Sequence, residues 1–147
     1  MALVLGLNAK LYISTTLVTP VTWDLVSNCK DLTLTMEKNT ADVTVRGTAG
    51  WRAIVAVLKD ATVEFKMQWD TSDPNFTIIQ DAFFSNSTLN VQVMDGDNVA
   101  GPAQGLQALC MVVTFTRNEP LEEALNVDVQ FKPTYSLTTP PVWVTVP

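Results

Sequence analysis

The sequence predicts a mainly β protein, a β-sandwich or barrel-like fold flanked by one α-helix. The clearest evidence is residues 61–69, in which large apolar side chains alternate with polar or charged ones. Successive side chains of a strand point to opposite faces, so this period of two describes a sheet with one buried face and one polar face. The alternation recurs at residues 32–37 and 125–131. Many short strands with turns between them, and only one helical pattern, are typical of a sandwich or barrel.

Residues 9–69 contain several strand-like runs. The two glycines within residues 47–50 suit the positive φ angles of a tight turn. Residues 51–57 are apolar and β-branched enough for a strand, although their alanines would tolerate a helix. In chain order we expect a strand at 9–14, a loop at 15–20, a short strand at 23–26, a strand at 32–37, a turn at 38–40, a strand at 42–46, a turn at 47–50, a strand at 51–57, a turn at 58–60 and the strand at 61–69.

The second half contains the one convincing helix. Asp73 is a suitable N-cap and Pro74 suits the first helical position, where its missing N–H costs nothing. Phe76, Ile79 and Phe83 then recur at helical spacing. The helix is followed by expected strands at 89–94, at 106–115, which is apolar on nearly both faces, at 125–131 and at 142–146, with a loop at 95–104 and an interruption at 118–120.

The size and charge of the chain limit its function. The 147 residues fit one domain with a sizeable core, and a hydrophobic content of 47% argues against disorder throughout. The formal net charge is -6 and there is no histidine. An acidic surface repels phosphate, so a surface that grips nucleic acid by neutralising its phosphates is disfavoured.

The cysteines and the N-terminus indicate the compartment. Cys29 and Cys110 are the only cysteines, and neither has a metal-binding spacing. Two free thiols in a reducing compartment is the simpler interpretation, and a disulfide is the alternative. The first eight residues hold a short apolar run with no basic segment, and no stretch approaches the ~20 apolar residues of a membrane span. We expect a soluble protein that is made in the cytosol and has no membrane partner.

No motif predicts a catalytic, cofactor or metal site. Residues 95–98 begin like a calcium loop, but the glycine and glutamate required later in an EF-hand are missing, so a turn is the better interpretation. Glu119, Glu122 and Glu123 could supply an acid/base pair, yet they follow or flank a proline in what should be an exposed loop. The lack of histidine removes the usual general base. We expect no enzymatic activity and no cofactor.

Three tryptophans are candidates for a core or a partner surface. Trp51 and Trp143 lie in short apolar segments beside turns or prolines, where large aromatic side chains often anchor a partner. Ordinary core packing is the alternative for both. Trp69 continues the apolar face of residues 61–69, so we expect it in the core.

A set of segments occurs in a fixed order along the chain. They are GLNAKLY at 6–12, KDLTL at 30–34, the acidic strand that leads into RG at 46–47, GWRA at 50–53, LKDATVEF at 58–65 followed by WD at 69–70, DAFF at 81–84, VMDG at 93–96 and RNEPLEEA at 117–124. Together, over about residues 6–134, they resemble the major tail proteins, or tail tube proteins, of long, non-contractile-tailed phages of the lactococcal type. The chain would then consist of a tail tube domain, 1–134, and a proline-rich C-terminal tail, 135–147.

The resemblance implies a structural virion protein with a tail-tube fold. Such subunits form hexameric rings that stack into a hollow tube, and DNA passes through the tube during injection without specific binding. The implied partners are further copies of the chain and the tape measure, tail terminator and baseplate proteins. The implied location is the virion tail, assembled in the host cytoplasm.

The residues themselves suit such a tube. Strand edges can pair between subunits and close a ring, and an acidic bore would not bind the phosphates that it conveys. Lumen-facing candidates are the acidic residues of polar strand faces: Glu37, Asp42, Glu64 and Asp128. Candidates for contact between rings are Arg46, Trp51 and Arg52, because residues 37–52 combine charges of both signs, a glycine turn and an apolar tryptophan.

Two other functions remain open at this point. A carbohydrate-binding β-sandwich module would account for Trp51, Trp143 and the lack of catalytic residues, but such modules are usually secreted with a catalytic domain. A hydrolase that uses carboxylates is the weaker alternative. A tube protein must form rings or filaments, whereas a module should stay monomeric.

Overall fold

The described residues form one antiparallel eight-stranded sheet with a single α-helix on it, which confirms the predicted mainly β class. The computed structural model describes residues 3, 5–14, 23–119, 121–122, 124–137 and 140–147. The strand order is β2-β1-β5-β6-β7-β4-β3, and β8 pairs with β6. The strands are β1 (Lys10–Ser14), β2 (Asp24–Leu25), β3 (Cys29–Asp42), β4 (Ile54–Gln68), β5 (Thr88–Met94), β6 (Ala103–Asn118), β7 (Asn126–Pro133) and β8 (Val142–Val146); the helix is α1 (Pro74–Ser85), and Gly6–Asn8 and Arg46–Thr48 are 3-10 turns.

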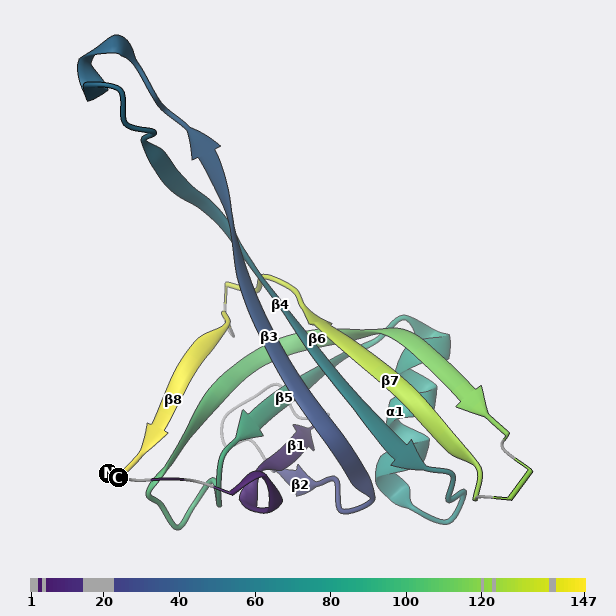
Figure 1. Ribbon diagram of the computed structural model, residues 1–147. Coiled ribbons are helices and arrows are strands. Elements are labelled where there is room, and N and C mark those ends of the chain that lie inside the picture. The colour runs from purple at the N-terminus through teal and green to yellow at the C-terminus, as the bar shows by residue number, and fades with distance from the viewer. Residues whose placement is uncertain (1–2, 4, 15–22, 120, 123, 138–139) are drawn as a thin grey trace.

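Strand β6 joins the two halves of the sheet. Its first part pairs with β5 on one side and with β8 on the other, and its second part pairs with β7. The sheet therefore bends along β6, so that the half formed by β3, β4 and β7 lies over the half formed by β1 and β5 (Figure 1). Residues Ala108, Leu109 and Cys110 at this bend are buried, as the apolar pattern on both strand faces predicts. The result is sandwich-like although the strands form one continuous sheet.

The main core lies between the two halves and under α1. Val63, Phe65 and Met67 are 0–3% exposed and belong to one cluster with Phe76 and Ile79 of the helix. The predicted burial of this strand face against the helix is confirmed. Strands β1, β5, β6 and β7 contribute further fully buried side chains to this core. They are Leu11, Ile13, Val91, Cys110, Val127, Val129 and Phe131.

The helix begins as the sequence predicts. The Asp73 carboxylate accepts a hydrogen bond from the amide of Asn75, 3.0 Å away, which satisfies one of the N–H groups left open at a helix start. Asn86 takes the left-handed conformation at the other end, with φ 58°. Trp69 packs edge to face against Phe76 with ring centroids 4.8 Å apart, so its predicted core position is confirmed.

Two predicted turns are wrong. Residues 38–40 and 58–60 do not turn; they lie inside β3 and β4, where Lys38 pairs with Lys59. The register then shifts, because two residue steps of β3, from Lys38 to Thr40, oppose three steps of β4, from Lys59 to Ala56. An extra residue of this kind is a β-bulge, which interrupts the ladder without ending the strands. The chain reverses only after Asp42, where the predicted strand 42–46 gives way to a 3-10 turn at Arg46–Thr48.

The C-terminal strand is part of the sheet. The sequence places residues 142–146 between prolines, and as β8 they pair with Ala103–Gln107 of β6. The predicted loop 15–20 lies outside the described residues.

Candidate functional site

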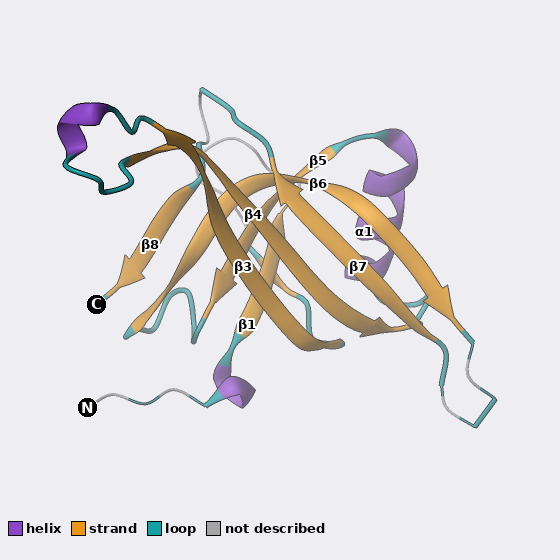
Figure 2. Cartoon of the chain, turned by 45° about the horizontal axis from the view of Figure 1, so that its top comes forward, coloured by secondary structure: helices purple, strands orange, loops and turns teal. Residues whose placement is uncertain are grey.

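Strands β3 and β4 extend far beyond the rest of the sheet as a two-stranded hairpin (Figures 1 and 2). We call residues 36–60, the part beyond the body, the arm. Strand β4 pairs with β7 only from Val63 to Gln68, so its first nine residues, 54–62, have β3 as their strand partner. The second edge of each arm strand carries no strand partner among the described residues.

The arm exposes large apolar side chains along its length. Trp51 is 79% exposed, and the others range from 48% to 66%. These residues are Met36, Val43, Val45, Trp51, Ile54, Val55, Val57 and Leu58. Monomeric proteins rarely expose so many large apolar side chains within one segment, and such exposure more often marks a contact with a partner.

The backbone of the arm leads to the same conclusion. A two-stranded hairpin without further packing is at best marginally stable in water, and open strand edges attract other strands. An arm with apolar faces and open edges therefore gains stability when another molecule covers it. The arm is a candidate assembly surface.

The tip of the arm carries the three predicted contacts between rings. Arg46 begins the 3-10 turn, and Trp51 and Arg52 follow it on the returning side. Ala49 and Gly50 take positive φ angles of 54° and 83°, so the conformation expected of glycine falls on Gly50 but not on Gly47. All three side chains are exposed and belong to the same end of the arm.

Hydrogen bonds at its base hold the tip in place. The Ala53 amide donates to Thr44 Oγ1 at 2.9 Å, and the Val43 amide donates to the Ala53 carbonyl at 2.9 Å. The carboxylate of Asp42 accepts from the Thr44 amide at 2.9 Å. Hydrogen bonding to Thr44, from its side chain first and its amide second, lowers the pKa of Asp42. Asp42 thus acts in the local turn as a capping carboxylate.

The second candidate surface is the outer side of β3, β4, β7 and the end of β6, which we call the polar face. The strand register places its residues together, because Thr33 is opposite Glu64, Glu64 is opposite Gln130, and Gln130 is opposite Thr114. Its members are Lys30, Asp31, Thr33, Thr35 and Glu37 of β3, Asp60, Thr62, Glu64 and Lys66 of β4, Asp128, Gln130 and Lys132 of β7, and Thr114 and Thr116 of β6.

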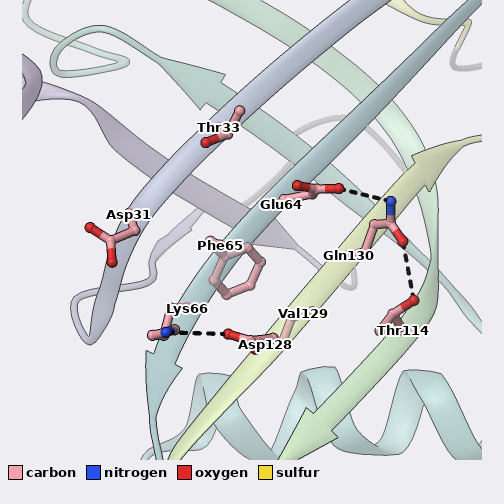
Figure 3. A pocket seen from close by; sticks show the side chains of 9 residues that line it. All are labelled: Asp31, Thr33, Glu64, Phe65, Lys66, Thr114, Asp128, Val129 and Gln130. Carbon is pink, nitrogen blue, oxygen red and sulfur yellow. Dashed lines mark hydrogen bonds and ion pairs between the residues drawn. The ribbon is translucent and has the colours of Figure 1, made fainter.

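Side chains on the polar face are tied together across the strands (Figure 3). Thr114 donates to the Gln130 amide oxygen at 3.1 Å, and the Gln130 amide nitrogen donates to Glu64 at 3.1 Å. In a second row, Lys66 approaches Asp128 to 3.9 Å. The rows border a shallow hollow of about 420 Å³.

Three of the four lumen-facing candidates lie on this face. Glu37, Glu64 and Asp128 share it through the strand pairing. Asp42 lies beyond the bulge, near the tip of the arm. Because Glu37 and Asp42 are an odd number of residues apart in β3, they point to opposite sides of that strand. Glu37, Glu64 and Asp128 therefore share the polar face, and Asp42 is separate from them near the tip of the arm.

The charges on the polar face are acidic in excess. Five carboxylates stand against three ammonium groups: Asp31, Glu37, Asp60, Glu64 and Asp128 against Lys30, Lys66 and Lys132. Lys66 and Lys132 lie 3.9 and 3.4 Å from Asp128 and Asp60. Exposed pairs of this kind contribute little to stability, but they neutralise charge locally. Among these charges, Asp31, Glu37 and Glu64 are then left against Lys30, and these three carboxylates set the negative potential of the face.

The other residues singled out in the sequence have structural surroundings. The Asp97 carboxylate accepts from the amides of Val99 and Ala100, which closes a turn and lowers its pKa. Glu119 forms an ion pair with Arg117 at 2.6 Å. No group of three or more metal-binding side chains occurs among the described residues, and none of the described helices could cross a membrane.

Both cysteines are free, as the simpler interpretation predicts. Burial raises the pKa of Cys29 and of Cys110 to about 12. Both therefore stay protonated and poorly reactive near neutral pH.

The chain matches the family model of the phage tail tube protein over residues 8–138. The chain belongs to the phage tail tube protein family. It is thus a structural component of a phage tail, in agreement with the expectation of a virion protein without enzymatic activity. This membership also decides against the carbohydrate-binding and hydrolase alternatives. No curated protein sequence matches the chain.

Solved structures share the fold at low sequence identity. The tail tube of SPP1 superposes with a TM-score of 0.74 at 10% identity, over 97% of this chain and 80% of that one. The tail of an empty gene transfer agent particle, refined with helical and C6 symmetry, gives 0.73 at 14% identity, over 97% and 98%. A chain of the anti-feeding prophage baseplate gives 0.67 at 10% identity, over 99% and 98%. The tail-tube fold predicted from the resemblance is confirmed.

Sequence reasoning missed most of the arm's apolar surface. Ile54, Val55 and Val57 look like an ordinary buried strand, and the interpretation of residues 58–60 as a turn separated them from β4. One signal was present: consecutive apolar residues occupy both faces of a strand whose partner, residues 38–42, is polar. A strand of this kind has no place in the core unless something outside the subunit covers it.

Proposed function

We propose that this tail tube protein forms hexameric rings that stack into a hollow tube, and that the tube conducts DNA during injection. The projecting arm is the observation that carries the proposal. A surface with eight exposed large apolar side chains and open strand edges is unsuited to a lone subunit and suited to contact with further copies. The C6 symmetry of the gene transfer agent tail, which has the same fold, supports a six-fold ring.

The arm is suited to join one ring to the next. Arg46, Trp51 and Arg52 lie in and after its 3-10 turn. The tip of the arm projects well away from the body (Figure 1). A contact between different surfaces of two copies does not close on itself, so its repetition builds an open stack.

The polar face is suited to line the bore. A conduit for DNA must be wet, and it must not bind phosphate. The excess of carboxylates on this face meets both requirements, with Glu37, Glu64 and Asp128 facing the lumen. The cross-strand hydrogen bonds hold Gln130 and Glu64 in fixed orientations, which limits their adaptation to passing DNA.

At a finer level, we propose a long, non-contractile tail of the lactococcal-phage type. The resemblance of the segments at residues 6–12, 50–53 and 58–65 supports this assignment, as does the fold shared with the SPP1 tail tube. The partners would be the tape measure protein inside the tube, the tail terminator at one end and the baseplate at the other. A chain from the anti-feeding prophage baseplate has the same fold as this protein, which supports the baseplate as a partner of similar architecture.

Negative-stain microscopy of the purified protein over a range of concentrations tests the proposal. We expect rings with six-fold symmetry and tubes with a continuous central channel. A protein that remains monomeric at all concentrations, with and without a tail initiator complex, would contradict it.

A further inference from the structure

The body contains an apolar groove that the arm does not reach within one subunit. It has a volume of about 360 Å³ and lies where β3 faces the ends of β5 and β8. Leu32 and Leu34 line it from β3, Val93 from β5 and Trp143 from β8. The Trp143 indole donates to Gln104 at 3.0 Å, so the ring is held at the groove although it is 52% exposed.

We infer that this groove receives the tip of the arm of a second copy in the adjacent ring, with Trp51 as the inserted side chain. This inference rests on the proposed stacking of rings and names the surface that the arm contacts. It also assigns a role to Trp143, which the sequence left between core and partner contact.

Size and chemistry favour Trp51 as the occupant. A dry cavity of ~150 Å³ lined by leucine, isoleucine and phenylalanine can hold a benzene ring, so a groove of about 360 Å³ has room for an indole. Trp51 is the most exposed large apolar side chain of the arm at 79%. Buried aromatic anchors in apolar pockets carry much of the energy of protein interfaces.

Charge favours the same pairing. Arg46 and Arg52 flank Trp51 at the tip, and Asp95 lies at the rim of the groove. The Asp95 carboxylate accepts a hydrogen bond from the backbone amide of Gln104 at 2.8 Å, which fixes the position of Asp95 at the rim. A tip with an apolar centre and a cationic border thus meets a groove with an apolar centre and an acidic border.

The placement of the two surfaces gives a stack. The arm rises from one end of the body, whereas the end of β5 and the start of β6, which border the groove, lie toward the other end (Figure 1). Each subunit therefore offers a tip at one end and a groove at the other. Contacts from tip to groove run in one direction and repeat without closing.

Cross-linking of cysteine pairs tests the contact directly. Ala9 lines the groove and Ala49 lies beside Trp51 at the tip, and both are small residues whose replacement removes no side-chain hydrogen bond. Treatment of assembled Ala9→Cys/Ala49→Cys protein with a short bis-maleimide linker should give a ladder of covalent multimers. Each single variant alone should give none, because the contact joins different surfaces. The native cysteines should react slowly because burial raises their pKa values to about 12.

A matched control separates this contact from random collision. Ala124 is also an exposed alanine, but it lies in the loop before β7, away from the groove. The Ala124→Cys/Ala49→Cys pair should therefore give no ladder. Tubes without a ladder from the Ala9 pair would overturn the inference and leave the proposed function standing. The absence of both tubes and ladder would contradict both, and a ladder from Ala49→Cys alone would show contact between two tips instead.

Substitution of the anchor gives a second measurement. Trp51→Ala should raise the protein concentration required for tubes by about tenfold or more, since truncation of a central aromatic anchor costs at least this much affinity. Trp51→Phe should restore part of the loss. Leu121→Ala, at a position that is 99% exposed and far from the arm, should change nothing. Equal tube formation by Trp51→Ala and Leu121→Ala would overturn the inference.

Discussion

The two ends of strand β4 both carry large apolar side chains but have opposite surroundings. Val63 and Met67 in the body are 0–1% exposed, whereas Ile54 and Val57 in the arm are both 58% exposed. The body half has α1 and the facing strands over it, and the arm half has only β3 beside it. The apolar sequence of a strand therefore indicates that its side chains require burial. The topology of the sheet decides whether the subunit itself or a neighbouring subunit covers them.

The largest difference between the two regions should appear in folding stability. Phe65→Ala removes a buried ring that packs edge to face against Phe131, with centroids 5.3 Å apart. It should lower the free energy of unfolding by about 3–5 kcal/mol. Val57→Ala in the arm should change it by less than about 0.5 kcal/mol. Urea unfolding of both variants measures the contrast, and similar losses would show that the arm folds onto the subunit.

A glycine near the start of β6 provides a second test of the body. A Cβ atom at Gly105 would overlap with the carbonyl oxygen of Val93 on the paired strand β5. Gly105→Ala should cost about 1–3 kcal/mol or more, because backbone must move to admit it. Gly6→Ala, where the added methyl meets no atom within 4 Å, should be nearly neutral. Thermal unfolding compares the two, and an unchanged Gly105→Ala protein would mean that β5 and β6 lie farther apart than described.

The smallest effect on stability, with an effect on function, should come from the polar face. Glu64→Lys with Asp128→Lys removes exposed carboxylates, so the subunit should fold and form tubes. Each change repeats in every subunit, so the bore should attract phosphate and slow DNA ejection. The delay should be larger at low salt, where the Debye length reaches about 30 Å at 0.01 M. Ejection rates from particles with the double variant at low and high ionic strength measure it. Unchanged rates from intact tubes would place these residues outside the bore.

The local elements of the fold could be predicted from the sequence because their signals are local. Alternation fixed the inner face of residues 61–67, and Asp73 with Pro74 fixed the start of the helix. The turns at 38–40 and 58–60 were misplaced because lysine, asparagine and aspartate suit both a turn and a solvent-exposed strand. Only the pairing of Lys38 with Lys59 across the hairpin distinguishes the two, and this pairing is a property of the folded chain.

The candidate surfaces were predictable only in part. Arg46, Trp51 and Arg52 could be assigned to a projecting segment, because charges, glycines and a tryptophan occur together in a short stretch; their contact with another ring stays a prediction. The groove could not, since Leu34, Val93 and Trp143 come together only when β8 pairs with β6 and the sheet bends. The separation of Asp42 from Glu37 could not be predicted either, because the sequence indicated a turn at 38–40, where β3 in fact continues.

The central claim is that the arm serves assembly and the body folds without it. Replacement of residues 41–55 by Asn-Gly joins the paired residues Thr40 and Ala56 through a two-residue hairpin turn. Thermal unfolding and negative-stain microscopy of this variant provide the most direct measurement. We predict an unfolding temperature within about 4 °C of the unmodified protein and no tubes. Normal tubes from the shortened chain would contradict the account.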